Sequence, residues 1–222
     1  MAGRTAEWLR PSPGERMMDL GSGTGLFLRE MVKSAAPDTP ILCVDPFQSM
    51  LDQVPDDPRY RTICASAEDV AEGKVPLPYD KLDVIACKET IHHVRDIAGT
   101  LASLARMMNP GGRILLVSLV PRLEYPIFQA ALDRFEENQP NPEGMRRDME
   151  AAGLRAELAY EEWPVTVDRD EYIELVRRQW MSVLSTFSKE EIEEGVKEIR
   201  QRYSAGSISF KDRFAFVYGV KP

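Results

Sequence analysis

Short apolar runs alternate with amphipathic segments along the first 120 residues of the chain. Strand-like runs lie at residues 16–20, 41–45, 60–64, 82–87 and 113–119, and the run at 114–117 is continuously hydrophobic, as a strand buried on both faces should be. Between them, residues 24–36, 48–53, 67–71 and 97–108 have the spacing of helices. This alternation predicts an α/β fold, in which a doubly wound, mostly parallel sheet carries helices on both faces.

The pattern changes after residue 120. Residues 126–137 and 143–152 are predicted as helices, and residues 155–167 as an extended segment. Residues 168–187 share one apolar stripe and are predicted as a helix whose stripe, Trp180 included, packs into the hydrophobic core of the protein. The stripe consists of Ile173, Val176, Trp180, Leu184 and Phe187. A second helix begins at Ser188, which has capping-box spacing to Glu191. Period-two alternation over 207–220 predicts the last strand.

The length fits one large domain with insertions. No linker separates the helical segment near the C-terminal end from the strands on either side of it. We therefore expect a single domain over residues 1–222, with residues 121–146 and 166–205 as helical cap insertions.

Charge narrows the classes of function. The 222 residues include 28 Lys and Arg against 36 Asp and Glu, and the formal net charge is −8. The sequence shows no basic face that would favour nucleic acid as a partner.

No apolar run approaches the roughly 20 residues of a membrane span, and residues 1–9 lack a signal-peptide core. We expect a cytoplasmic protein without a nucleic-acid or membrane partner, either a monomer or a homodimer.

The three cysteines, Cys43, Cys64 and Cys87, lie in or beside apolar runs. Their odd number and the lack of CxxC spacing fit neither a disulfide framework nor a zinc site. The sequence predicts three buried, reduced thiols and no metal.

Residues 19–25 (DLGSGTG) are the most informative stretch. An acidic residue ends a predicted strand, glycine follows at alternate positions, and a predicted helix comes next. Glycine permits positive φ and close approach of a ligand, and a helix start offers unpaired N–H groups. A dinucleotide loop requires G-x-G-x-x-G, but Leu26 stands at its third glycine position. This departure disfavours NAD and FAD, and a phosphate-binding P-loop motif is missing.

Asp45 ends the second predicted strand, 22 residues after Gly23. A carboxylate at this place can accept hydrogen bonds from both hydroxyls of a ribose. Alone, Asp45 would be interpreted as a turn residue, but together with the glycine loop it favours a nucleoside ligand.

With these residues the chain resembles the class I S-adenosylmethionine-dependent methyltransferases, in particular their type 11-like small-molecule group. The first motif of that family matches residues 19–25, its ribose acid matches Asp45, and its adenine segment matches residues 65–69. Its fourth-strand motif matches 79–85 and continues into 91–94, and its turn before the fifth strand matches 108–113. The resemblance covers about residues 14–120. It implies a Rossmann-like sheet of seven strands with the last one antiparallel, and S-adenosyl-L-methionine as cofactor.

The resemblance also implies which residues bind this cofactor. They follow the first three strands and end the fourth: Asp19, Gly21, Ser22, Gly23, Thr24, Asp45, Pro46, Phe47, Ser66, Ala67, Glu68 and Lys88.

Methyl transfer from a sulfonium depends mainly on alignment and exclusion of water, and it needs a general base only if the acceptor atom carries a proton. The two histidines of the chain, His92 and His93, follow the fourth strand, near the place where the family binds the reacting methyl group. We predict them as candidate bases, with Glu89 as a third candidate. The alternatives are packing against the cofactor for the histidines and surface charge for Glu89.

Several absences narrow the acceptor. The [DN]-P-P-[YF] loop of nucleobase amino-methyltransferases, the carboxylates of metal-dependent catechol enzymes and the double-glutamate loop of protein arginine methyltransferases are all missing. A transferase acting on a small organic acceptor is the prediction. A non-catalytic S-adenosylmethionine-binding or partner protein is the alternative, and an NAD-dependent oxidoreductase is disfavoured.

Only 15 residues precede the first predicted strand, so we expect the cover of the site to come from residues 125–139 and 166–205, unless the chain is shortened at its start. Candidate acceptor contacts in this half are Trp163, Tyr172, Arg177, Arg178 and Trp180.

Overall fold

The computed structural model describes residues 2–204 and 206–222. Met1, the first residue of the predicted domain, and Ala205, the last residue of the predicted insertion 166–205, lie outside the described residues. The chain divides into two compact units. Unit 1 contains the chain up to Ser118 together with Pro142–Ala159 and Ala215–Pro222, and unit 2 contains Leu119–Asn141 and Tyr160–Phe214. The expectation of a single domain with two cap insertions stays a prediction.

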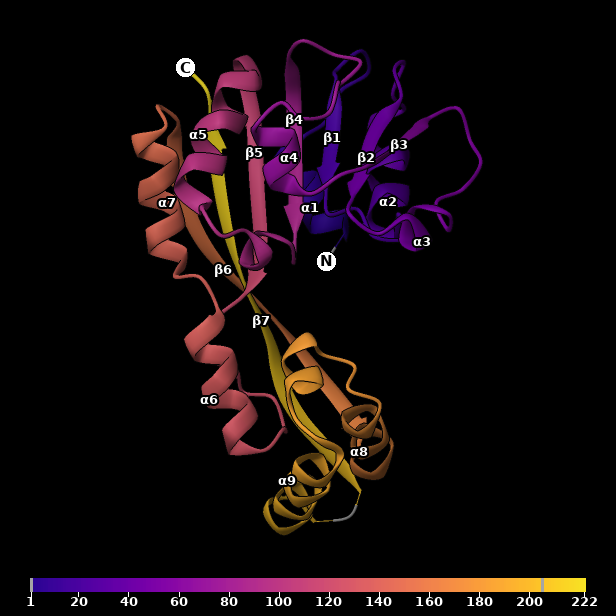
Figure 1. Ribbon diagram of the computed structural model, residues 1–222, viewed down its shortest axis with the longest axis vertical. Helices are drawn as coiled ribbons and strands as arrows, with labels where there is room; N and C mark the ends of the chain where they lie inside the picture. Colours follow the sequence, from indigo (N-terminus) through magenta and orange to yellow (C-terminus); the bar gives the residue numbers. More distant parts are fainter. Residues whose placement is uncertain (1, 205) are drawn as a thin grey trace. The chain divides into compact units, whose positions relative to one another are not determined.

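Seven strands form one sheet in the order β3-β2-β1-β4-β5-β7-β6 (Figure 1). They are β1 (Met17–Leu20), β2 (Ile41–Asp45), β3 (Tyr60–Cys64), β4 (Leu82–Lys88), β5 (Met108–Leu119), β6 (Arg155–Asp168) and β7 (Ser207–Val220). β3, β2, β1, β4 and β5 pair in parallel. The predicted α/β sheet is therefore confirmed, although β5 also takes in the expected turn at 108–113.

The last strand runs antiparallel to β5. The N–H of Gly111 donates to the carbonyl of Lys221 at 2.8 Å, whereas the N–H of Val120 donates to the carbonyl of Arg213 at 3.3 Å. Residue numbers thus rise along β5 as they fall along β7, which confirms the predicted reversal.

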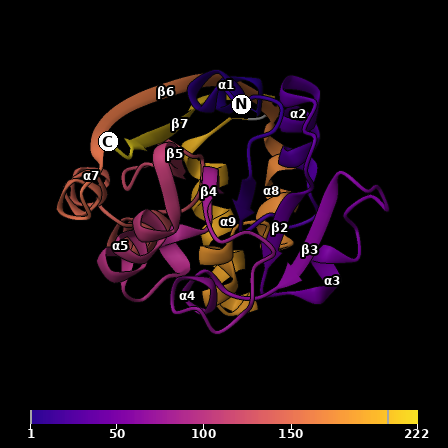
Figure 2. The same cartoon turned by 90° about the horizontal axis from the view of Figure 1, so that it is seen from above.

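Helices cover both faces of the sheet in unit 1 (Figure 2). On one face lie α1 (Ala2–Leu9) and α2 (Leu26–Ala35); on the other lie α4 (Ala67–Ala71), α5 (Ile97–Met107) and α7 (Pro142–Ala151), while α3 (Gln48–Leu51) follows β2. The α5 side encloses a core in which Leu20, Ile85, Leu104 and Met149 are fully buried. The sequence did not predict α1, although Thr5, Ala6 and Leu9 are buried at helical spacing.

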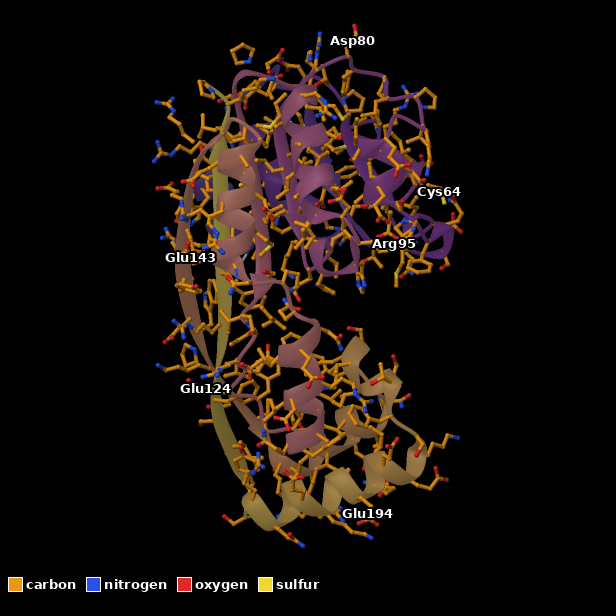
Figure 3. All side chains as sticks on the ribbon, turned by 60° about the vertical axis from the view of Figure 1, so that its left-hand side comes forward. Cys64, Asp80, Arg95, Glu124, Glu143 and Glu194 are labelled. Carbon is orange, nitrogen blue, oxygen red and sulfur yellow. The ribbon has the colours of Figure 1, made fainter. Side chains whose placement is uncertain are left out.

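Cys64 is exposed at the end of β3 (Figure 3), whereas Cys43 and Cys87 are buried. The prediction that all three thiols are buried is wrong for Cys64, because β3 is an edge strand that pairs only with β2. All three cysteines are free.

Unit 2 contains α6 (Gln129–Asn138), α8 (Arg169–Arg177), a 3₁₀ turn (Ser182–Thr186) and α9 (Lys189–Arg202). The capping box of α9 is confirmed: Ser188 Oγ accepts from the N–H of Glu191 at 3.2 Å, and Glu191 Oε2 accepts from the N–H of Ser188 at 2.7 Å. The helix predicted at 126–137 begins only at Gln129.

The prediction of one helix over 168–187 is wrong. α8 ends at Arg177, and the chain turns at Gln179, whose φ is +52°. The amide Nε2 of Gln179 donates to the carbonyls of Leu184 and Phe187, which stabilises the 3₁₀ turn instead of a longer helix. Trp180 is consequently 45% exposed rather than in the core.

Candidate functional site

A cavity of about 550 Å³ opens in unit 1 at the carboxyl ends of the parallel strands. The chain proceeds from β1 to β2 and β3 on one side of the sheet and to β4 and β5 on the other, and ligands bind at such a switch of direction. The walls of the cavity come from the segments at and after the ends of β1, β2, β3 and β4. The residues that line it are Gly21, Gly23, Asp45, Pro46, Phe47, Ser66, Ala67, Glu68, Lys88, Glu89, Thr90, His93 and Val94.

The glycine loop has a backbone that other residues rarely adopt. Gly21, Gly23 and Gly25 have φ values of +79°, +53° and +74°. The N–H groups of Gly21 and Ser22 both donate to the carbonyl of Val44, at 2.8 and 2.9 Å. The loop is therefore fixed to β2 and presents bare backbone to the cavity.

Asp45 joins the first two loops. Its Oδ2 accepts from the N–H of Gly23 at 3.0 Å, and its Oδ1 accepts from the N–H of Phe47 at 2.9 Å. Each carboxylate oxygen has a second lone pair, so a fixed carboxylate on the cavity wall can still accept two hydroxyl hydrogen bonds.

Asp19 lies behind the glycine loop and is only 1% exposed. Its Oδ2 has no hydrogen-bond partner among the described residues. Burial raises the pKa of Asp19 to about 7; the positive charge of Lys88 opposes this shift, and the carboxylate of Asp45 adds to it. A buried carboxylate of this kind would be stabilised by a cationic group of a ligand.

The loop after β3 is held by a complete capping box. Ser66 Oγ accepts from the N–H of Asp69 at 3.0 Å and donates to Asp69 Oδ2 at 2.7 Å. Glu68 Oε1 accepts from the N–H of Arg95 at 3.1 Å, and the Arg95 side chain forms an ion pair with it. These bonds fix the part of the wall that the resemblance assigns to adenine.

The two histidines differ in environment. Their ring centroids are 4.1 Å apart, but His93 is exposed and lines the cavity whereas His92 does not. Burial lowers the pKa of His92 to about 4, and the neighbouring His93 adds to this effect. His92 is therefore neutral at physiological pH, and His93 is the histidine that faces the cavity.

Most of the candidate residues come together in this one cavity. Asp19, Ser22, Thr24 and His92 do not line it: Asp19 and Ser22 are buried, while Thr24 and His92 are half-buried. Sequence reasoning missed Thr90 and Val94 as lining residues. Val94 belongs to the fourth-strand motif, which was a usable signal, whereas the role of Thr90 depends on its approach to Gly21.

The five candidate acceptor contacts lie in unit 2. Tyr172 is buried among aromatic rings, Trp163 packs edge-on against Phe214, and Trp180 stacks on Tyr125. Arg178 is exposed, and Arg177 forms ion pairs with Glu174 and Glu193. These ion pairs give Arg177 a structural role that needs no acceptor. The expectation that residues 166–205 cover the site stays a prediction.

Unit 2 has a wider cavity of about 700 Å³, lined by Phe128, Phe187 and glutamates of α9. Glu193, Glu194 and Glu198 on this wall form ion pairs with Arg177, Lys197 and Arg202. Glu194 marks the place in Figure 3. None of the predicted cofactor or catalytic residues lies there.

Among residues 2–204 and 206–222, no group of three His, Cys, Asp or Glu side chains could hold a metal ion. Within the same part of the chain, no helix is both long and apolar enough to cross a membrane.

The sequence profile of the methyltransferase domain family matches residues 2–185, and the chain belongs to this family. The chain is similar to the ubiquinone/menaquinone biosynthesis C-methyltransferase of Cereibacter sphaeroides, with 29% identity over 138 residues, which are 60% of this chain and 53% of that protein. Other curated relatives are matched over 30% to 42% of their length.

Solved structures share the fold at low identity. The YcgJ protein of Bacillus subtilis has a TM-score of 0.66 at 18% identity, covering 99% of this chain and 97% of that one. Phosphoethanolamine N-methyltransferase 2 of Haemonchus contortus, solved in complex with S-adenosyl-L-methionine, has a TM-score of 0.61 at 16% identity, covering 98% of this chain and 51% of that one.

S-adenosylmethionine is the methyl donor of this family, and the residues present fit it. The bare glycine loop, the fixed carboxylate of Asp45 and the buried, unpartnered Oδ2 of Asp19 match a ligand with both a ribose and an ammonium group.

Proposed function

We propose that this protein transfers the methyl group of S-adenosylmethionine to a small organic acceptor. The observation that carries the proposal is the Asp45 carboxylate, held on the cavity wall by the N–H groups of Gly23 and Phe47. In this proposal it accepts both ribose hydroxyls. Lys88 faces the carboxylate of the methionine part, the segment Ser66, Ala67 and Glu68 contacts the adenine, and Asp19, buried beside the glycine loop, attracts the ammonium by its charge.

When bound, S-adenosylmethionine supplies an electrophilic methyl group on a positively charged sulfur. The walls of the cavity align this group and exclude water. His93 is the proposed general base for an acceptor that must lose a proton. His92 stays neutral beside it and is proposed to position the His93 ring through the tilted contact between the two rings.

Relatives support the acceptor class. The curated relative from Cereibacter sphaeroides is named for methylation in quinone biosynthesis, which is small-molecule chemistry. A cytoplasmic location is part of the proposal, because free thiols are typical of reducing compartments and the cysteines here are free.

The proposal is tested in two steps. Calorimetry first measures binding of S-adenosylmethionine to the full chain. A screen with a labelled methyl donor over a metabolite library then identifies the acceptor. A protein that does not bind the donor would contradict the proposal, and one that binds it but methylates nothing would favour the non-catalytic alternative.

A further inference from the structure

The turn after β4 (residues 89–95) carries His93, the base of the proposed function. His93 and Val94 line the cavity, and Ile91–His93 form a single 3₁₀ turn. A short segment of this kind has few hydrogen bonds of its own. The position of the His93 ring in the cavity therefore depends on what holds the two ends of the turn.

The start of the turn is held by β5 and by the glycine loop. The N–H of Glu89 donates to the carbonyl of Val117 on β5 at 2.8 Å. Thr90 donates its Oγ1 hydrogen to the carbonyl of Lys88 at 3.0 Å and lies against Gly21. These contacts fix the turn where the chain leaves β4.

The end of the turn is held by a side chain from another wall of the cavity. The N–H of Arg95 donates to Glu68 Oε1 at 3.1 Å, across 27 residues of the chain. Glu68 belongs to α4 and lines the cavity beside Ala67. One hydrogen bond thus joins the wall that the resemblance assigns to adenine with the turn that carries His93, two residues before Arg95.

The Glu68 carboxylate has no other role that explains this contact as well. Asp69, not Glu68, completes the capping box of α4 with Ser66. The Arg95 guanidinium also pairs with Glu68, at 3.6 Å, but the Arg95 side chain is 92% exposed, so this ion pair contributes little. The bond from the backbone N–H to the carboxylate is charge-assisted and is the stronger of the two.

We propose that Glu68 is a positioning residue, whose carboxylate holds the N–H of Arg95 and thereby keeps His93 in place beside the donor. The inference rests on the proposed function. A nucleoside bound against Ala67 and Glu68 restricts the first turn of α4 and, through this bond, the turn after β4. Donor binding is therefore coupled to the order of the wall that carries His93, and the coupling acts equally in both directions.

Four variants separate this bond from its neighbours. Glu68→Ala removes the acceptor, whereas Glu68→Gln keeps an amide oxygen that can accept the bond. Arg95→Pro removes the donor and changes no residue that lines the cavity. The preceding residue, Val94, has φ of −84° and ψ of +129°, which is the backbone favoured before proline. Arg95→Ala is the matched control, because it removes the exposed guanidinium and retains the N–H.

The full chain is measured with S-adenosylhomocysteine as the probe. It contains two histidines, so the imidazole NMR signals of His93 can be assigned by comparison with His93→Ala. The readouts are the dissociation constant by calorimetry, the melting temperature, the His93 signals with and without the probe, and hydrogen exchange of the residue-95 amide where it is present.

In the wild type, S-adenosylhomocysteine should shift the His93 signals and slow exchange of the Arg95 amide. In Glu68→Ala this amide should exchange at least about tenfold faster, because a charge-assisted bond is lost. Its complex should show broadened His93 signals, as expected for a turn that moves on the microsecond-to-millisecond timescale, while affinity for the probe falls by less than about tenfold.

The other variants should follow from the same bond. Arg95→Pro should reproduce the His93 signals of Glu68→Ala, and combining the two substitutions should add no further change. Glu68→Gln should restore most of the protection of the Arg95 amide, and Arg95→Ala should resemble the wild type. If Arg95→Pro fails to fold, Glu68→Ala and Glu68→Gln decide the question by the same readouts.

The inference is overturned if the Arg95 amide of Glu68→Ala exchanges as in the wild type, if the His93 signals of its complex are unchanged, or if Arg95→Ala reproduces the effect. A loss of affinity greater than about tenfold in Glu68→Ala would indicate that the carboxylate acts on the adenine directly, and would also overturn it. These outcomes leave probe binding by the wild type intact, whereas failure of the proposed function would show as a wild-type protein that does not bind S-adenosylhomocysteine.

Discussion

A β-carbon placed on Gly21 would lie 1.8 Å from Oγ1 of Thr90, far inside van der Waals contact. The glycine loop after β1 therefore meets the turn after β4 at a point where only a hydrogen atom fits. This contact brings together the part of the cavity wall formed by the glycine loop and the part that carries Glu89 and His93.

Gly21→Ala should destabilise the fold, because it adds this clash to the strain of a positive φ. We expect a loss of about 2–4 kcal/mol in the free energy of unfolding, measured by urea denaturation. Gly23→Ala is the matched control, since its φ is also positive but no atom lies within 4 Å of the added carbon. Equal losses of stability in the two variants would contradict the packing argument.

Asp45→Ala should weaken binding of S-adenosylmethionine by about 10- to 150-fold, since charge-assisted hydrogen bonds of this kind are worth about 1.5–3 kcal/mol. Calorimetry measures the effect. Asp45→Asn controls for the loop, because its amide oxygen can still accept from one backbone N–H. Unchanged affinity in a folded Asp45→Ala variant would sink the ribose assignment.

His93→Ala should slow transfer to a protonated acceptor by about 10²–10⁴ while cofactor affinity stays nearly constant. His92→Gln is the control, since it removes the neighbouring ring, which does not line the cavity, and it should slow transfer less. A parallel loss of rate and cofactor affinity in His93→Ala would instead indicate packing.

The pKa of Asp19 predicts a pH dependence of stability. Because the folded-state pKa of about 7 exceeds the usual value of 3.8, the folded protein binds more protons between these values. Its free energy of unfolding should therefore fall, relative to Asp19→Asn, as pH rises from 4 to 7, by up to about 4 kcal/mol. Urea denaturation of both proteins at pH 5 and 8 checks this. The lowered pKa of His92 changes stability in the opposite direction, but it does so in both proteins and cancels in the comparison.

The same group predicts how donor binding depends on pH. If the ionised carboxylate pairs with the ammonium, affinity for S-adenosylmethionine should fall as pH drops below 7, by about tenfold per unit. Asp19→Asn should bind weakly and lose this dependence. A pH-independent affinity in the wild type would exclude the ammonium assignment.

Cys64 should be the one fast-reacting thiol of the native protein. Cys43 and Cys87 are buried, and burial raises the pKa of Cys43 to about 12, so their thiolates are scarce. A thiol-specific disulfide reagent should therefore modify one equivalent quickly, and Cys64→Ser should abolish that phase. Rapid reaction of two or more thiols would show that the core opens more readily than its packing suggests.

The sequence predicted β1, β2 and β4 well because both faces of these strands are buried, whereas β3 is largely exposed at the edge of the sheet. β2 and β3 begin and end where the apolar runs do, and β1 begins at Met17. The glycine loop and Asp45 were recognisable because their chemistry depends on residue type and spacing, which a sequence displays directly.

Periodic patterns failed where contacts outside the helical or strand repeat decide the structure. The apolar stripe through Trp180 has helical spacing, but the bonds of Gln179 to Leu184 and Phe187 end the helix before it. Exposure of Cys64 follows from the edge position of β3, which depends on strand order. Glu89 has a φ of +50° and donates its N–H to the carbonyl of Val117 on β5, a contact that the residues around Glu89 do not predict.

Strand β7 has a consequence for how the protein is made. Phe216 and Val217 near its end are fully buried in unit 1, and β7 lies between β5 and β6 in the sheet. During translation, β5 emerges about a hundred residues before the strand that covers its edge, so a nascent chain exposes that edge to other chains meanwhile. Premature stop codons between β5 and β7 should therefore yield insoluble fragments, even though every residue that lines the cavity of unit 1 has been synthesised.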